Sequence, residues 1–456
     1  MATTRPRTLE DEYLQIVHDL DGDLAGREAG EEYLRATGAH ALPGVSGWAL
    51  TPYVLNAAQA GLLADAARTL SSIMEKVMAK YHRDRSFRAH FGLSPEIEAM
   101  TLVPTGRRAA VPLARVDVLF DQRTNDYKIS GIVTGGIDGM AGSVEVVRAV
   151  RQSASFHEFA SRHGSVESFD AVSECILTLL HTYGNWANAK EGRNHPTNPA
   201  LAVVDYDDSA RRAETDYVIE RMHEMGCYAH ATDPSRLRIE RVAGVDQVVD
   251  DHGPITCAWL RATADEAVAH GCQGIDALLR ATRRGLVCTI GGYRSWPCCT
   301  QGFLEVLRDK ECRALFSSEE EAFVDEHVIE TCVITTATDV SRFYDQENWV
   351  LKVSDAHTGV TTHAGRDMGK AAWRALLTKA IRRNDAVQAY VPQHVMRVLP
   401  GSADGGDARS AREVNVVLGM YLFSGELRGL RALCGTGGTT VEWEDPRPLA
   451  CLVARD

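Results

Sequence analysis

The sequence WVLKV at residues 349–353 begins the stretch that decides the fold, which runs on to Pro392. A second short strand is expected over 359–362, an amphipathic helix over 366–383, and a β-rich run over 387–392. A lysine in an apolar strand, followed by a turn, a strand, a helix and a strand, is an arrangement that can clamp a nucleoside triphosphate between two sheets. The lysine would lie on phosphate, and the last strand would offer backbone groups to adenine. The alternative is an ordinary ββαβ unit whose lysine is solvated.

Length and composition indicate a globular protein of two or three domains. The chain has 456 residues, 45% of them apolar, and no apolar run reaches membrane-spanning length. Because residues 1–12 are polar, we expect no signal peptide and a cytoplasmic location. The formal charge of −13 argues against a nucleic-acid or membrane-surface partner. The 11 cysteines include no C-x-x-C pair, which predicts reduced thiols and no cysteine zinc site.

A hairpin is the clearest local feature of the first half of the chain. Strands are expected over 113–120 and 127–133, with turn residues between them. If the turn centres on Thr124, Arg115 lies opposite Val133 and Asp117 lies opposite Gly131. Opposite residues share a face, so these four positions would line one surface. On their own, Arg115 and Asp117 would make a structural ion pair.

The pattern of expected elements predicts a mixed α/β chain in four regions. Residues 1–110 are largely helical, and 111–194 hold the hairpin and two helices. Residues 195–300 alternate strands with helices, which predicts a small doubly wound parallel sheet, and no G-x-G-x-x-G follows its first strand. Residues 301–456 hold the opening stretch and a β-rich end.

In this order, these segments resemble the circularly permuted ATP-grasp family, which includes glutathionylspermidine synthase and related carboxylate–amine ligases. The resemblance covers most of the chain, and its segments are the R-x-D strand at 112–117, the E-x-N strand at 127–134, an arginine-bearing strand at 259–261, the two nucleotide lysines in 308–310 and at Lys352, the adenine hinge at 387–391, and an ending with Gly425, Gly429 and Arg431. It implies a permuted ATP-grasp fold with a pre-ATP-grasp domain over 195–300 and a helical N-terminal layer.

The resemblance implies an ATP-dependent ligase that forms an amide or peptide through an acyl-phosphate, in specialised small-molecule or peptide biosynthesis. The substrates would be a small-molecule carboxylate and an amine, or a carrier protein or peptide. The implied roles are Lys310 and Lys352 on the α- and β-phosphates, Ser354 and Gly359 in the phosphate turn, Gln388, Ala389, Tyr390 and Val391 at adenine, Asp117 on Mg²⁺, and Arg115 and Arg431 on the γ-phosphoryl or acyl-phosphate. Arg428 is the alternative to Arg431.

Two positions depart from the family pattern. Gly131 and Val133 stand where the family carries glutamate and asparagine metal ligands, and neither side chain can bind Mg²⁺. One explanation is a non-catalytic member that serves as a binding or partner protein. The other is a ligase that uses another carboxylate, such as Asp138 or Asp355, or that needs less metal.

Overall fold

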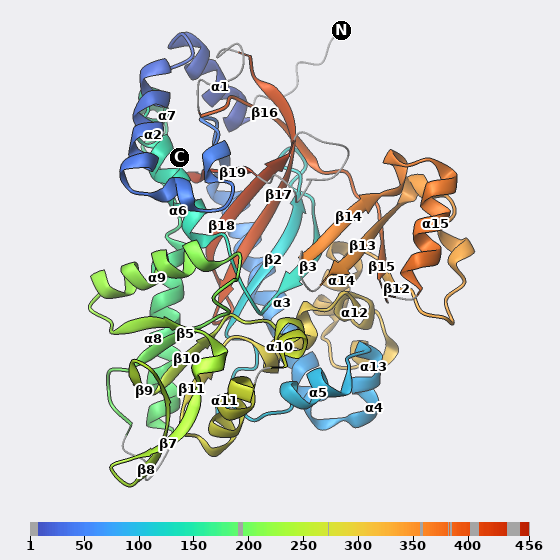
Figure 1. The fold of residues 1–456 in the computed structure, drawn as a ribbon. Coiled ribbons are helices and arrows are strands. Elements are labelled where there is room, and N and C mark those ends of the chain that lie inside the picture. The colour runs from blue at the N-terminus through green and yellow to red at the C-terminus, as the bar shows by residue number, and fades with distance from the viewer. Residues whose placement is uncertain are drawn as a thin grey trace.

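The structure is a computed structural model, and it describes residues 8–189, 195–271, 273–355, 359–381, 383, 385–401, 410–435 and 447–455. Residues 356–358 of the expected phosphate turn lie outside this part of the chain. A long antiparallel sheet runs through the middle of the molecule, and three groups of elements surround it (Figure 1). The predicted mixed α/β class is confirmed.

The central sheet has six strands in the order β19-β18-β17-β2-β3, with β16 beside β17. Their bounds are β2 (Leu113–Phe120), β3 (Tyr127–Val133), β16 (His394–Val398), β17 (Arg412–Phe423), β18 (Glu426–Gly435) and β19 (Arg447–Leu449). The long helix α3 (Ala57–Arg83) packs on one face of this sheet, where Val116, Leu418 and Met420 join its core. Because side chains alternate along a strand, the intervening residues point to the other face.

Within the region expected to be largely helical, the long helix α3 is preceded by a short strand. Residues 53–56 form strand β1 (Tyr53–Asn56), which pairs in parallel with β20 (Cys451–Arg455). Asn56 then caps α3 in a capping box with Gln59, which fixes where the helix starts. The pairing partner lies almost four hundred residues away, so local periodicity could not reveal the strand.

The opening stretch of the sequence folds as a separate four-stranded sheet, which we call the lid sheet. Its order is β12-β15-β13-β14, with β12 (Thr331–Val333), β13 (Trp349–Asp355), β14 (Gly359–Ala364) and β15 (Ala386–Ala389). Helix α15 (Lys370–Ala380) covers one face, and Leu351, Val353 and Val387 pack against it. The predicted strand–strand–helix–strand order is confirmed, but the helix is shorter than expected, and Tyr390 and Val391 follow the last strand.

The predicted doubly wound parallel sheet is present in the order β11-β10-β5-β6. Its strands are β5 (Leu201–Val204), β6 (Ala229–Thr232), β10 (Cys257–Leu260) and β11 (Cys288–Ile290). Helices α8 (Ala171–Asn188) and α9 (Arg212–Glu224) lie on one face, and α10 (Ala264–His270) and α11 (Gln273–Arg284) lie on the other. The sequence did not predict the inserted antiparallel strands β7 (Arg238–Val242), β8 (Val245–Asp250) and β9 (Gly253–Ile255).

The N-terminal layer packs α1 (Leu9–Asp19) and α2 (Leu24–Ala36) against α6 (Met140–Val150) and α7 (Ala154–Arg162). The remaining elements are α4 (Arg85–Arg88), α5 (Pro95–Thr101), α12 (Gln301–Val306), α13 (Lys310–Arg313), α14 (Ser318–His327) and β4 (Ser165–Glu167). Ten cysteines lie in the described part of the chain, and all of them are free, as predicted. No helix in that part combines the length and apolar character needed to cross a bilayer.

Candidate functional site

The β2–β3 hairpin brings the four predicted positions to one face of the central sheet. Arg115 pairs with Val133 and Asp117 pairs with Gly131, which confirms the predicted register. Near the turn the pairing is one residue out of step with this register, and a β-bulge next to Asp117 restores it. The extra residue is Ser130, whose hydroxyl donates to the Asp117 carbonyl at 3.1 Å.

Gly131 faces the predicted metal position. A Cβ at this residue would lie 3.7 Å from Asp117 Oδ2 and 3.8 Å from Lys352 Nζ. A longer acidic side chain here would therefore point at both groups. Gly131 itself offers no side-chain oxygen beside Asp117.

Two predicted nucleotide residues of the lid sheet meet the bulge on the central sheet. Lys352 Nζ donates a hydrogen bond to the Ser130 carbonyl. Gln388 Nε2 donates to the same carbonyl at 3.0 Å and to Thr331 Oγ1 at 3.0 Å. Both side chains leave the lid sheet on the face opposite α15, because Leu351, Val353 and Val387 point to the helix. The lid sheet is thus joined to the central sheet beside Asp117.

Burial lowers the pKa of Lys352 to about 8, and the nearby charge of Asp117 offsets only part of this effect. The lysine is charged below this pH and loses its charge as the pH rises through it. If Lys352 holds phosphate, we expect kcat/KM for ATP to fall as the pH rises above about 8. A pH profile measures this fall, and a flat profile from pH 7 to pH 9.5 would contradict it.

Arg115 links the hairpin to the loop that follows it. Its Nε lies 2.9 Å from Asp117 Oδ1 and its Nη2 lies 3.3 Å from Asp117 Oδ2. Its Nη1 donates to Asp138 Oδ1 at 2.6 Å, and Arg431 Nη1 reaches the same oxygen at 3.2 Å. Burial raises the pKa of Asp138, but the charges of Arg431 and Arg115 outweigh it and bring the pKa to about 2. Arg115, Asp117, Asp138 and Arg431 form what we call the charged cluster.

The structure separates the two candidate arginines of β18. Arg431 lies in the charged cluster, and 13% of its side chain is exposed. Arg428 lies 3.7 Å from Glu174 on helix α8, and 49% of its side chain is exposed. Arg431 is therefore the residue placed with Arg115.

Two glycines allow the loop between β3 and α6 to carry Asp138 into the cluster. Gly139 has a φ of +81°, and a Cβ there would lie 2.4 Å from the Arg431 Cζ atom. Gly136 has a φ of +63°, and its Cβ would lie 2.9 Å from Thr263 Cγ2. The Asp138 carbonyl also accepts a hydrogen bond from the Tyr421 hydroxyl at 2.7 Å.

The parallel sheet also holds the loop between β3 and α6 that carries Asp138. Arg261, which follows β10, is fully buried, and its Nη2 donates to the Ile137 carbonyl at 3.0 Å and to Glu214 at 2.7 Å. Its Nη1 donates to Thr215 Oγ1 at 2.9 Å. Arg261 therefore holds the backbone next to Asp138.

The carboxyl ends of β5 and β10 are where the order of the parallel sheet reverses, which is a common ligand position in such folds. Asp205 follows β5, and Arg211 bridges it to Glu266 at 2.8 Å on each side. This ion-pair network and Arg261 lie at the same edge. No sequence pattern pointed to Asp205, Arg211 or Glu266, although a charged residue at the end of a buried strand, such as Asp205, was a usable signal.

The remaining predicted residues lie apart from the charged cluster or have backbone roles. Lys310 is exposed at the first position of α13, and no contact brings it to Lys352 among the described residues. The backbone N–H of Ala389 donates to the Glu330 carbonyl, and that of Tyr390 donates to the Asn348 carbonyl. Arg366 stacks 3.5 Å from the centre of the Tyr390 ring.

The other predicted residues of the lid sheet lie at the ends of its strands. Ser354 pairs with Val360 at the end of β13, and Gly359 begins β14. Val391 is half-buried just beyond β15.

The described residues fit triphosphate better than they fit Mg²⁺. Magnesium takes oxygen ligands, but both oxygens of Asp117 already face Arg115, and Gly131 and Val133 supply none. Asp138 is likewise held between two guanidinium groups. Arg115, Arg431 and Lys352 bring three cations to the same face, and an anion there would share Arg115 and Arg431 with the two carboxylates.

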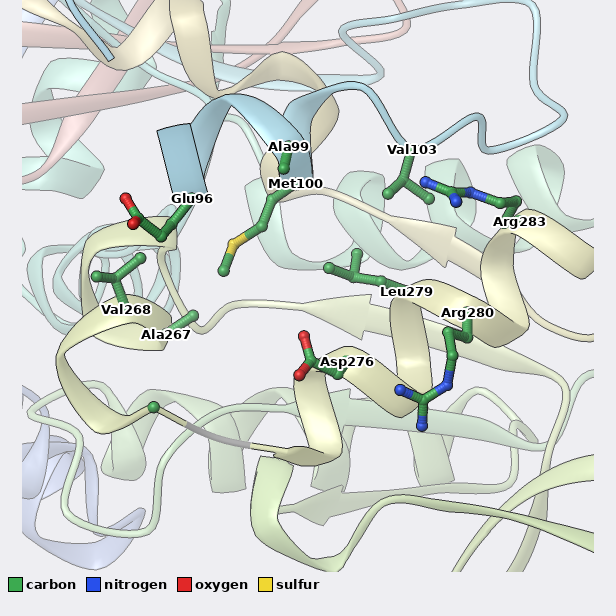
Figure 2. Close-up of a pocket in the computed structure, with 11 residues that line it drawn as sticks. Glu96, Ala99, Met100, Val103, Ala267, Val268, Asp276, Leu279, Arg280 and Arg283 are labelled. Carbon is green, nitrogen blue, oxygen red and sulfur yellow. The ribbon is translucent and has the colours of Figure 1, made fainter. Parts of the chain in front are cut away.

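A separate cavity of about 500 Å³ lies between α5 and the helices α10 and α11 (Figure 2). Met100 and Leu279 point into it, while Glu96 and Asp276 balance the charges of its two arginines. None of the predicted site residues lines this cavity. We therefore place the candidate site at the charged cluster.

Comparison with known proteins relates the chain to others only through its structure. No family model matches the sequence, and no curated protein matches it. One solved structure, a glutathione synthetase-like effector from Globodera pallida in its apo form, is 11% identical, covers 94% of this chain and 96% of that chain, and has a TM-score of 0.60. A second solved structure, assigned as a gamma-glutamylcysteine synthetase from Methylobacillus flagellatus, is 10% identical and covers 88% of this chain and 89% of that chain. Its TM-score is only 0.37. The chain thus has the fold of a glutathione synthetase-like protein.

Proposed function

We propose that the protein is an ATP-dependent carboxylate–amine ligase that works through an acyl-phosphate. The observation that carries the proposal is the meeting of Lys352 and Gln388 of the lid sheet with Ser130, beside the Arg115 and Asp117 pair. Residues from two separate sheets, predicted for one nucleotide, converge there. The glutathione synthetase-like fold of the chain supports the same conclusion.

In the proposed reaction, a carboxylate oxygen attacks the γ-phosphorus of ATP, ADP leaves, and an amine then displaces phosphate from the acyl-phosphate. Negative charge spreads over the transferred phosphoryl group, so fixed cations stabilise it. Lys352 would hold the β-phosphate side, and Arg115 and Arg431 would face the transferred group. Gln388 anchors the lid to the central sheet through the Ser130 carbonyl and would keep Lys352 in place.

We further propose that the acid and the amine bind where the parallel sheet meets the charged cluster. The loop that carries Asp138 touches both the central sheet and Arg261, so a substrate at that edge would lie next to the phosphoryl group. The described residues there include both acids and arginines, which suits small charged substrates such as amino acids. A specialised biosynthetic role is consistent with a carboxylate and an amine of this kind.

ADP and phosphate release, measured over a panel of amino acids and amines, tests the ligase proposal. We expect substrate-dependent ADP release that Arg431→Met reduces on the order of 10²-fold or more. Arg428→Met is the matched control, because Arg428 lies on the same strand but outside the cluster, and it should retain full turnover. Absence of turnover with every substrate and metal would reject the ligase proposal, as would equal losses in both variants.

One observation favours a second candidate, a nucleotide-binding protein that no longer catalyses ligation. Gly131 has no side chain to bind a metal beside Asp117, and Arg115 contacts both oxygens of Asp117. Calorimetric titration with ATP, with and without Mg²⁺, separates the two candidates. Binding of ATP that is indifferent to Mg²⁺ and is followed by no ADP release would favour the second candidate, and tight Mg²⁺-dependent binding would count against it.

A further inference from the structure

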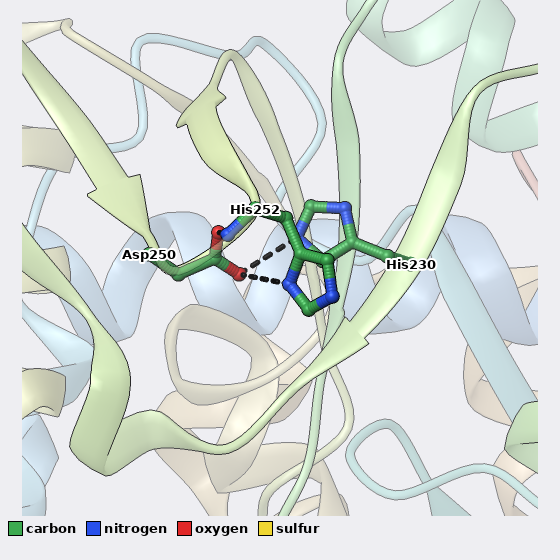
Figure 3. Close-up of side chains that lie close together, drawn as sticks. All are labelled: His230, Asp250 and His252. Atoms are coloured by element: carbon green, nitrogen blue, oxygen red, sulfur yellow. Dashed lines mark hydrogen bonds and ion pairs between the residues drawn. The ribbon is translucent and has the colours of Figure 1, made fainter.

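A cluster of metal-binding side chains lies outside the candidate ligase site. His230 on β6, Asp250 at the end of β8, and His252 in the turn to β9 each bring one ligand atom within 4.8 Å of the others. His230 Nε2 lies 2.7 Å from Asp250 Oδ2, and His252 Nδ1 lies 3.7 Å from the same oxygen. Figure 3 shows both imidazole rings next to this carboxylate. The centres of the two rings lie 4.5 Å apart.

The surrounding backbone fixes the cluster in place. The side chain of Asp250 is completely buried, and its Oδ1 accepts a hydrogen bond from the His252 N–H at 2.8 Å. Its other oxygen, Oδ2, is the one that faces both histidines. Gly253 has a φ of +121°, which allows the tight turn that returns His252 over Asp250. The carboxylate is therefore held rigidly with one oxygen directed between two rings.

His230 faces the carboxylate with Nε2, and its other ring nitrogen, Nδ1, is buried without a hydrogen-bond partner among the described residues. No described group therefore competes through Nδ1 for the orientation of this ring. The side chain of His252 is 53% exposed, so the cluster is open to solvent on one side.

We propose that His230, Asp250 and His252 bind a divalent transition-metal ion of the Zn²⁺ type. Two imidazole nitrogens and one carboxylate oxygen suit zinc and its neighbours, whereas Mg²⁺ requires oxygen ligands. Zinc–ligand bonds of about 2.0–2.2 Å bring tetrahedral ligands to roughly 3.4 Å from one another, so only small side-chain movements are needed. Water from the open side supplies the remaining ligand.

The ion would join two parts of the domain that otherwise meet at an edge. β6 is the last strand of the parallel sheet, and β8 and β9 belong to the inserted antiparallel strands. A bond from each part to one metal fastens the insertion to the sheet. The site shares no residue with the charged cluster. The metal proposal is therefore independent of the ligase proposal and can be tested separately.

Titration of the full chain, first stripped of metal with a chelator, tests this inference. We expect one equivalent of Zn²⁺ by calorimetry and a rise in Tm on zinc addition, while Mg²⁺ has neither effect. Removing one ligand should weaken Zn²⁺ binding by about 10–100-fold or more. His252→Ala is the first variant, because the ring is exposed and its loss should leave the fold intact.

The matched control is His18→Ala. His18 also lies 3.7 Å from a carboxylate, that of Asp19, but no second histidine joins the pair among the described residues. Its replacement should leave zinc affinity unchanged. Substitution with Co²⁺ reports the ligands, and a thiolate charge-transfer band would assign the metal to cysteine and overturn the proposal. Failure of the wild type to bind Zn²⁺ would also overturn it. So would an equal Zn²⁺ affinity in the wild type, His230→Ala and His252→Ala.

Discussion

Lys352→Met is expected to reduce ATP turnover strongly and, at the same time, to make the protein more stable at pH 7. The charged lysine is held in a buried position that lowers its pKa from 10.5 to about 8. Burial of this charge costs free energy, and a shift of this size corresponds to roughly 3 kcal/mol at pH 7. Methionine has a similar length and no charge, so the variant avoids this cost.

The structure predicts that this replacement leaves no partner unpaired. The Ser130 carbonyl keeps its hydrogen bond from Gln388, and Asp117 keeps Arg115. The gain in stability should therefore appear directly in thermal melts. Loss of the phosphate contact should reduce kcat/KM for ATP on the order of 10²–10³-fold.

The pH dependence of this stability difference has a definite sign. Between about pH 8 and pH 10.5 the unfolded wild type binds a proton that the folded wild type does not, so wild-type stability rises with pH in this window. The advantage of Lys352→Met should be largest below pH 8 and fade toward pH 10.5. Lys379→Met, at an exposed lysine on α15 of the same lid, should change neither turnover nor stability. A destabilised Lys352→Met would show that the lysine is structural.

Sequence patterns predicted the parts of the fold that short-range geometry dictates. The hairpin register of Arg115 and Asp117 followed from one turn, and the lid sheet followed from alternation around Lys352. Both depend on residues within about forty positions of each other. The bulge at Ser130 escaped prediction, although the core residues Ile129 and Ile132 stand three positions apart and so break the strict alternation of the strand.

The charged cluster could be predicted only in part, since distant segments assemble it. Asp138 reaches Arg431 across almost three hundred residues, and the glycines that permit the approach are common in any loop. The Arg261 and Glu214 pair joins a strand end to a helix, and although the resemblance marks Arg261, nothing in the sequence marks Glu214 as its partner. Such contacts depend on how the sheets dock, which local propensity does not specify.

Arg261→Met is expected to destabilise the protein by about 3–5 kcal/mol, because it leaves Glu214 buried without its cation. Arg261 is fully buried, and Glu214 is 3% exposed at 2.7 Å from it. Glu214 would retain only the Ala141 N–H, at 3.0 Å, among its described partners. Urea unfolding measures the loss. Arg212→Met removes an exposed ion pair with Asp216 on the same helix and should cost less than about 1 kcal/mol.

The double variant Arg261→Met/Glu214→Gln separates the stability effect from the effect on the site. Glutamine can still accept from Ala141 but carries no charge to bury, so much of the lost stability should return. Turnover should not return with it, because the Ile137 carbonyl still lacks the Arg261 hydrogen bond that holds the backbone beside Asp138. Recovery of both properties would show that Arg261 only neutralises Glu214. Recovery of stability alone would show that the parallel sheet positions the charged cluster through this arginine.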